Sequence, residues 1–210
     1  MLGLEFDIKF LYASMAAALM VVSYIPYFRD MVAGRTKPHT YTWLIWLITQ
    51  GTAIAALLHG GGGGFAAAAL IIAEALVFTV FVASFSYGTK NITRFDTLVF
   101  LLALLSIFVW WQLDSPLYAV LLVTAIDVFG YIPTVRKCYG EPWSESLPAW
   151  SLYNVSNFFT LLALNEYNML TVPYITAMLF ANASIVVICL MRRSIIPRPP
   201  SVEATLHRGI

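Results

Sequence analysis

Charged side chains are scarce in this chain of 210 residues: only 11% of them are Asp, Glu, Lys or Arg, whereas 60% are hydrophobic. Soluble globular domains contain about 25% charged and about 45–50% apolar residues. The shortage of charge therefore argues against a soluble domain and indicates an integral membrane protein. The formal net charge is +1 at pH 7, and no basic cluster is large enough to predict nucleic-acid binding.

Cysteine and the common catalytic motifs are also scarce. The two cysteines, Cys138 and Cys189, stand too far apart for a metal-ligand motif or a disulfide framework, so we expect free thiols and no metal or other cofactor. The chain has no HExxH motif, no nucleophile elbow and no acid pair at a catalytic spacing. Its last apolar run lacks the lysine that a retinal photoreceptor needs. We therefore do not expect an enzyme or a photoreceptor.

Long apolar runs dominate the rest of the sequence. A helix needs about 20 mainly apolar residues to cross the hydrocarbon core of a membrane. Seven runs meet this requirement: 8–28, 40–59, 65–87, 96–113, 116–135, 147–165 and 170–191. The sequence thus predicts an all-α integral membrane protein with seven transmembrane helices. The glycine run at 60–64 is expected to form an outer turn, because no Lys-Ser/Thr ending follows it to make a phosphate loop.

Basic residues lie almost entirely on one side of these predicted spans. They follow the first, third, fifth and seventh spans: Arg29, Arg35, Lys37, Lys90, Arg94, Arg136, Lys137, Arg192, Arg193, Arg198 and Arg208. Lys9 alone falls on the other side. Because lysine and arginine favour cytoplasmic loops, we expect an outer N-terminus and a cytoplasmic C-terminus. The proline-rich residues 193–210 are expected to form a disordered cytoplasmic tail.

One short sequence segment occurs twice, in degenerate form, at a constant offset of 107 residues. The segments 23–43 and 130–150 share five residues: Tyr24, Ile25, Pro26, Arg29 and Trp43 correspond to Tyr131, Ile132, Pro133, Arg136 and Trp150. This repeat predicts two three-helix bundles, in residues 1–88 and 115–192, joined by a linker helix in 89–114. Because the linker adds one membrane crossing, both bundles run in the same direction and form a parallel repeat.

The arrangement of two such bundles resembles the SWEET, SemiSWEET and PQ-loop transporter superfamily. The Tyr-Ile-Pro segments look like its Pro-Gln signature, with Tyr27 and Thr134 standing in place of glutamine. The resemblance covers the seven spans in topology and a few residues per repeat in sequence. It implies a midplane substrate site between the repeats, with Pro26 and Pro133 as gating hinges. The residues alone leave open that these prolines only kink or end their helices. Vitamin transporters of the PnuC type and the KDEL receptor resemble the same fold, so the activity stays open.

Two acidic residues lie near the middle of predicted spans. Glu74 and Asp127 have no lysine or arginine within their own spans, and a charge at mid-membrane costs about 2.5–3.5 kcal/mol on insertion scales. We expect both to be proton-coupling or charge sites, which would also suit a cationic substrate. The alternative is a neutral acid that is hydrogen-bonded across helices.

Tryptophan and amide side chains provide further candidate substrate contacts. Trp150, Asn154 and Asn157 recur at spacings of four and three, so they share one helical face. Trp43 and Gln50 lie on the corresponding face of the second span. An aromatic plate with amides one turn away suits a small polar ligand. The alternative for the tryptophans is a belt at the membrane interface.

Asn182 is the last predicted substrate contact. In the SWEET-like proteins that the chain resembles, an asparagine at mid-depth on the third helix of each repeat points at the sugar. Asn182 occupies this place in the second repeat, whereas Glu74 stands nearest to it in the first. His39 and His59, at the two ends of the second span, are expected to be interfacial.

Two classes of function follow. The leading prediction is a transporter that moves a small polar solute (a sugar, an amino acid or a related metabolite) by alternating access, with proton coupling left open. The alternative is a receptor or ligand-binding membrane protein on the same scaffold that does not transport. The expected partners are this solute and membrane lipid, while a homo-oligomer is left open. A bacterial inner membrane is the expected location, and a eukaryotic organelle is the alternative.

Overall fold

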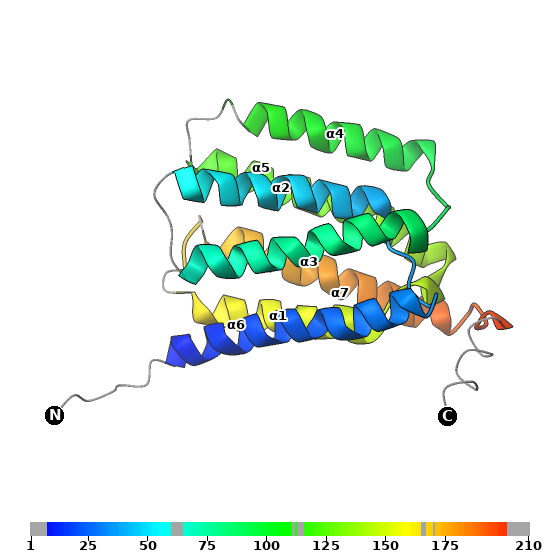
Figure 1. Ribbon diagram of the computed structural model, residues 1–210. Helices are drawn as coiled ribbons and strands as arrows, with labels where there is room; N and C mark the ends of the chain where they lie inside the picture. Colours follow the sequence, from blue (N-terminus) through cyan, green and yellow to red (C-terminus); the bar gives the residue numbers. More distant parts are fainter. Residues whose placement is uncertain are drawn as a thin grey trace.

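The computed structural model describes residues 8–59, 65–110, 112, 116–164, 167–169 and 171–200. All regular structure within these ranges is helical, which confirms the predicted all-α class (Figure 1). The elements are α1 (Ile8–Val32), α2 (Thr40–His59), α3 (Phe65–Tyr87), α4 (Arg94–Trp110), α5 (Pro116–Gly140), the short 3-10 helix η1 (Pro142–Ser144), α6 (Leu147–Ala163) and α7 (Val172–Arg193). The glycine run at 60–64 and most of the predicted tail lie outside the described residues.

Two helices are longer than the apolar runs that predict them. α1 continues to Val32 and α5 to Gly140, past the predicted ends at 28 and 135. α1 is followed by Gly34, whose φ of 69° is the left-handed conformation typical of a residue just beyond a helix. Pro26 and Pro133 consequently lie inside continuous helices, so neither proline ends its helix.

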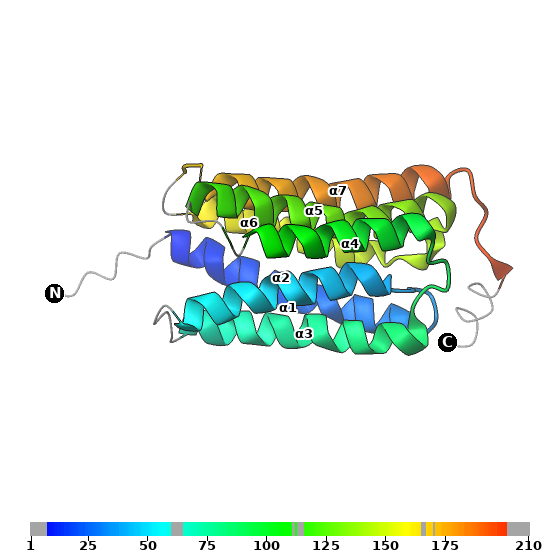
Figure 2. The same ribbon diagram turned by 90° about the horizontal axis from the view of Figure 1, so that it is seen from above.

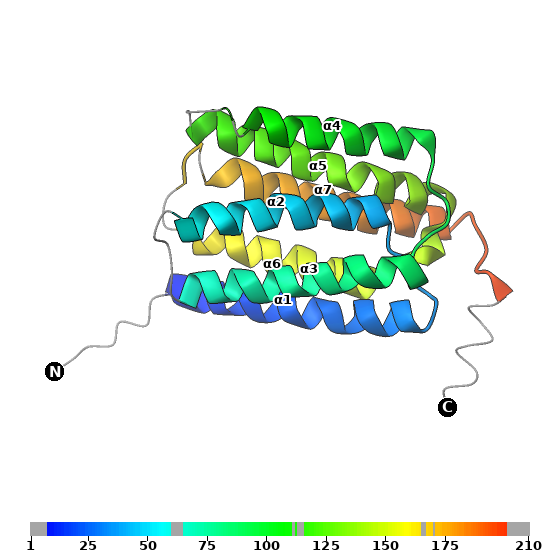
Figure 3. The same cartoon turned by 45° about the horizontal axis from the view of Figure 1, so that its top comes forward.

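Six helices form a closed ring. α1 packs against α3, α3 against α2, α2 against α5, α5 against α7, α7 against α6, and α6 against α1. In each set of three, the third helix lies between the first and the second. α4 packs outside the ring against α5 and α2 (Figures 1 and 3). Consecutive helices run in opposite directions, so α1 and α5 run the same way (Figure 2). The predicted bundle boundaries at 88 and 115 stay a prediction.

The outer surface of the ring is rich in large apolar side chains. Exposed examples occur on α1, α3, α4, α5, α6 and α7: Val21, Ile25, Ile72, Phe85, Leu101, Phe108, Tyr118, Phe158, Phe180 and Leu190. Among the described residues, two helices, α1 and α7, are long and apolar enough to cross a membrane. These two helices suggest membrane association, and the other five spans stay a prediction.

α2 and α5 approach each other closely at Gly130. A Cβ atom on Gly130 would lie 2.7 Å from Nε1 of Trp46 and 3.3 Å from Cγ2 of Ile45. The Nε1 atom of Trp46 also donates a hydrogen bond to the backbone oxygen of Asp127, at 3.3 Å. Residue 130 must therefore lack a side chain for the Trp46 indole to occupy its observed position.

This close approach predicts that Gly130→Ala lowers the thermal unfolding midpoint of the protein in detergent. Overpacking costs about 1–3 kcal/mol, which corresponds to a drop of several degrees for a chain of this size. Gly140→Ala is the matched control, because no atom lies within 4 Å of a Cβ there. Unfolding followed by tryptophan fluorescence measures both variants, and equal midpoints would contradict the prediction.

Candidate functional site

The ring encloses a pocket to which all six of its helices contribute. Its empty volume, including its opening, is about 560 Å³. The lining residues are Ser23, Tyr24, Tyr27, Trp43, Trp46, Gln50, Val77, Asp127, Tyr131, Ala149, Trp150, Tyr153, Tyr174 and Met178. Eight of these are aromatic, and Asp127 is the charged residue among them. The pocket is thus an aromatic enclosure with a single carboxylate in its wall.

Residues of the repeated segments line the walls of this pocket. Three pairs of lining residues stand 107 positions apart in the sequence: Tyr24 with Tyr131, Trp43 with Trp150, and Trp46 with Tyr153. Rings from the two halves of the chain are in contact, since the Trp46 and Tyr131 ring centroids are 4.7 Å apart. The repeat thus has a structural explanation: each half of the chain presents aromatic residues to the same pocket.

Trp43 and Trp150 lie inside the ring. Each is 5% exposed, and both line the pocket. A belt residue would instead lie on the outer surface, so the interfacial alternative for these two tryptophans is wrong. Gln50, predicted alongside them, also lines the pocket.

Asp127 is held in the pocket wall by two neutral hydroxyl groups. Oγ1 of Thr49 on α2 donates to its Oδ1 at 2.7 Å, and the hydroxyl of Tyr174 on α7 donates to its Oδ2 at 2.8 Å. The residue is 2% exposed, and it takes part in none of the ion pairs between described residues. Asp127 is therefore a buried carboxyl group without a protein cation beside it.

Glu74 lies just behind the wall, on α3. Its Oε1 would be 3.2 Å from a Cβ atom on Gly51, the neighbour of the lining residue Gln50. Its Oε2 is buried and has no hydrogen-bond partner among the described residues. The two predicted charge sites thus belong to the same region of the ring, with Asp127 in the wall and Glu74 behind it.

The three predicted asparagines are placed differently from the other candidates, because none is among the lining residues. Asn182 is fully buried, and its Oδ1 accepts a hydrogen bond of 2.9 Å from the hydroxyl of Tyr131. It therefore stands one layer behind the wall. Oδ1 of Asn154 and Nδ2 of Asn157 are buried without a partner among the described residues. Direct substrate contact stays a prediction for all three.

Tyr174 is a lining residue that sequence reasoning missed. It comes from α7, and the offset of 107 pairs it with Ala67, so the repeat gives no signal for it. Trp46 and Tyr153 do carry such a signal, because the same offset relates them. Tyr174 is recognisable only once folding brings its hydroxyl to Asp127.

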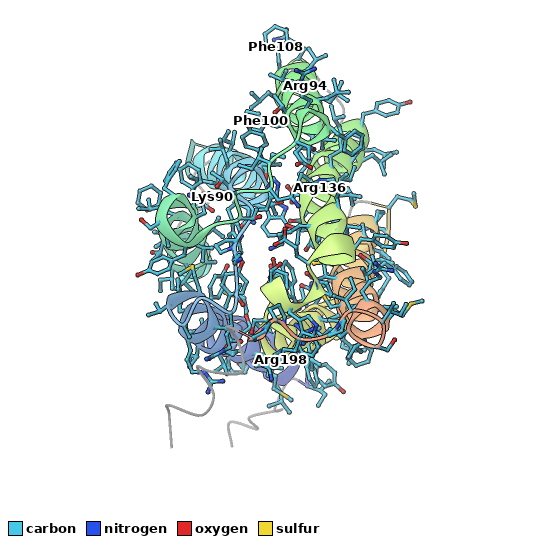
Figure 4. All side chains as sticks on the ribbon, turned by 90° about the vertical axis from the view of Figure 1, so that its right-hand side faces the viewer. Lys90, Arg94, Phe100, Phe108, Arg136 and Arg198 are labelled. Carbon is cyan, nitrogen blue, oxygen red and sulfur yellow. The ribbon has the colours of Figure 1, made fainter. Side chains whose placement is uncertain are left out.

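At the basic end of the ring, where Figure 4 labels Lys90, Arg94, Arg136 and Arg198, polar contacts join the two halves of the chain. The backbone N–H of Lys37 donates to the oxygen of Ser144 at 2.9 Å. Oγ of Ser146 donates to Oδ2 of Asp30 at 2.6 Å. A Thr42–Thr134 hydroxyl contact of 2.9 Å lies between these loops and the pocket. The basic-end network is defined here as six residues: Asp30, Lys37, Lys137, Ser144, Glu145 and Ser146.

A buried ion pair is the centre of the basic-end network. Lys137 is fully buried, and its Nζ donates to the Glu145 carboxylate and to the backbone oxygen of Lys37. Oε2 of Glu145 also accepts a hydrogen bond of 2.8 Å from Nε1 of Trp150, which lines the pocket. The sequence places Lys137 after the fifth predicted span, whereas it lies in the last turns of α5, with its side chain turned inward.

His39 is buried in the loop before α2. It lies at the end of the second span, as expected, but its side chain is fully buried within the protein; its place at the membrane interface stays a prediction. Its Nε2 is 3.5 Å from Oδ2 of Asp96. Arg136 donates two hydrogen bonds to the same carboxylate, at 2.7 and 2.6 Å. Burial lowers the pKa of His39 to about 4; Asp96 opposes this shift, whereas Lys137 and Arg136 add to it. His39 is therefore neutral at physiological pH.

The neutral state of His39 predicts a pH-dependent stability. The unfolded chain gains a proton at His39 below about pH 6.5, while the folded chain gains it only near pH 4. Stability should therefore fall as the pH falls through this window, by at most about 1.4 kcal/mol per pH unit. The midpoint of thermal unfolding should drop less between pH 6.5 and 4.5 in His39→Gln than in the wild type. Identical pH profiles would refute this role.

The ion pair predicts an asymmetry between single and double variants. Lys137→Met should destabilise the protein by about 3–5 kcal/mol, because Glu145 keeps a buried charge without its partner. Lys137→Met/Glu145→Gln should recover part of this loss, since the glutamine is neutral and still accepts a hydrogen bond from Trp150. Thermal unfolding in detergent measures both variants. A double variant no more stable than the single one would argue against the ion pair.

The chain matches no family model, no curated protein and no solved structure. The resemblance to the SWEET and PQ-loop superfamily accordingly depends on the helix order and on the repeated residues.

Proposed function

We propose that the protein is a seven-span transporter with SWEET-like organisation, which moves a small polar solute through the aromatic pocket by alternating access. The observation that carries this proposal is the pairing of pocket walls: residues 107 positions apart, from two helix triplets with the same order, face one cavity. A site made jointly by two repeats is the arrangement in which rocking of one repeat against the other exposes the site to each side in turn.

The distribution of side chains supports the membrane part of the proposal. Large apolar residues cover the outside, with Phe180, Phe85 and Phe108 60–70% exposed. Fully buried positions hold polar groups such as Lys137 and Asn182. Soluble monomers rarely expose apolar patches beyond a few hundred Å², whereas a lipid-facing surface is apolar throughout. The basic residues at one end favour a cytoplasmic location for it, and a bacterial plasma membrane is the proposed compartment.

The positions of the two prolines support a gating motion. Pro26 lies between the lining residue Tyr24 and the network residue Asp30, and Pro133 lies between Tyr131 and Lys137. Each proline removes one backbone hydrogen bond from its helix. The ends of α1 and α5 could therefore tilt at these points, separate the basic-end network and leave the pocket walls in place. The basic-end network is intact in the observed conformation, which we assign to a state closed at this end.

Alternating access predicts that the pocket can be reached from both sides of the membrane. Ser23→Cys places a thiol of nearly native size in the lining, in a background where both native cysteines are replaced by alanine. We expect a membrane-impermeant thiol reagent to modify it in intact cells and in inverted vesicles. Lys137→Met should accelerate modification from the basic side, because it weakens the closed network.

Ala103→Cys is the matched control for this measurement. Ala103 is fully buried on α4 and does not line the pocket, so it should stay unmodified from either side. Modification of Ser23→Cys from one side only, with or without Lys137→Met, would contradict transport. That outcome would favour the non-transporting receptor.

A further inference from the structure

We infer that the pocket binds a small organic cation carrying an alkylammonium group, with its charge set against Asp127 and the surrounding aromatic rings. This inference depends on the pocket being the substrate site of the proposed function. The described lining includes eight aromatic residues and one carboxylate among its fourteen residues, with no lysine, arginine or histidine. Aromatic faces attract cations through the ring quadrupole, and the attraction strengthens when water is excluded.

Asp127 supplies the charge that such a ligand would neutralise. Each carboxylate oxygen accepts one hydroxyl hydrogen bond, from Thr49 and from Tyr174. A carboxylate has about four lone-pair sites, so acceptor capacity remains after these two contacts. Buried charges are normally paired, and no described cation pairs with Asp127. A ligand ammonium group would be the missing counter-charge.

Two further groups near the pocket are also left unpaired. Tyr27 lines the pocket and is 4% exposed, and its hydroxyl makes no hydrogen bond of normal geometry with the described residues. Oε2 of Glu74, behind the wall, is likewise without a partner. The hydroxyl offers a polar contact, while a second carboxylate nearby adds to the negative potential that a cation would experience.

The placement of the amides argues against a sugar. A sugar presents many hydroxyl groups, and amide side chains that donate and accept are the natural partners for them. Of the four candidate amides, Gln50 lines the pocket, whereas Asn154, Asn157 and Asn182 do not. Asn182 is instead engaged by Tyr131. The wall that a ligand meets is thus aromatic and acidic, and it is poor in amides.

Matched ligands test this inference on the unmodified protein. Choline and 3,3-dimethylbutan-1-ol have nearly the same shape but differ in charge, and ethanolamine tests an unmethylated ammonium. Titrations followed by tryptophan fluorescence, in detergent at pH 8 and constant ionic strength, report on the indoles of the wall. We expect saturable binding of choline or ethanolamine, at least tenfold tighter than binding of the uncharged alcohol or glucose.

Asp127→Asn should weaken binding of the cation at least tenfold, while its unfolding midpoint shows whether it folds. Glu141→Gln is the matched acid-to-amide control, because Glu141 lies outside the pocket and contacts Asn91 at the surface. Equal affinity for choline and the alcohol, unchanged affinity in Asp127→Asn, or no saturable binding of either cation would overturn the inference.

The test of cation binding and the test of transport can fail independently of each other. If Ser23→Cys reacts from both sides but neither cation binds, transport stands and the substrate class is wrong. If a cation binds while Ser23→Cys reacts from one side only, the protein is a cation receptor, and the proposed transport fails.

Discussion

The buried ion pair between Lys137 and Glu145 is the contact on which the observed conformation depends. A lysine with no exposed surface must be compensated where it lies, and Glu145 does so while also accepting a hydrogen bond from Trp150 in the pocket wall. Lys137 reaches the Lys37 backbone in the other half of the chain as well. One side chain therefore links the closure of the basic end to the shape of the pocket.

The two halves repeat their geometry but not their charges. The offset that relates Tyr24 to Tyr131 also relates Asp30 to Lys137. Both members of this second pair belong to the basic-end network, yet one is acidic and the other basic. Asp30 accepts hydrogen bonds from Arg35 of its own half and from Ser146 of the other, whereas Lys137 donates to Glu145 of its own half and to the Lys37 backbone of the other. Aromatic residues, which carry no net charge, can recur unchanged, and they do so in the pocket.

Much of the fold could be predicted because it depends on properties that a sequence displays directly. Long apolar runs predict helices, and the constant offset predicted two corresponding units whose Tyr and Trp residues now line one pocket. Asp127 was recognisable because a charge within an apolar run has a high cost. The seven membrane crossings and the SWEET-like family stay predictions.

The remaining features depend on which side chains of different helices meet, which a sequence does not display. Asn182 shares a face of α7 with the lining residues Tyr174 and Met178, but its amide is hydrogen-bonded to Tyr131 and does not line the pocket. Lys137 follows the predicted fifth span, but α5 extends past it and places its side chain beside the loops that carry Lys37 and Ser144. His39 is buried for a similar reason, since Arg136 and Asp96 form a pair beside it.

The central claim is that the basic end opens about the two prolines while the pocket walls stay together. Val32 and Tyr139 occupy equivalent positions near the ends of α1 and α5 and are 66% and 60% exposed, so both can carry spin labels once the native cysteines are replaced. Their distance distribution in lipid nanodiscs is the most direct measurement. The account predicts a short and a long population, with Lys137→Met shifting the balance to the long one. A single short distance in both proteins would contradict it.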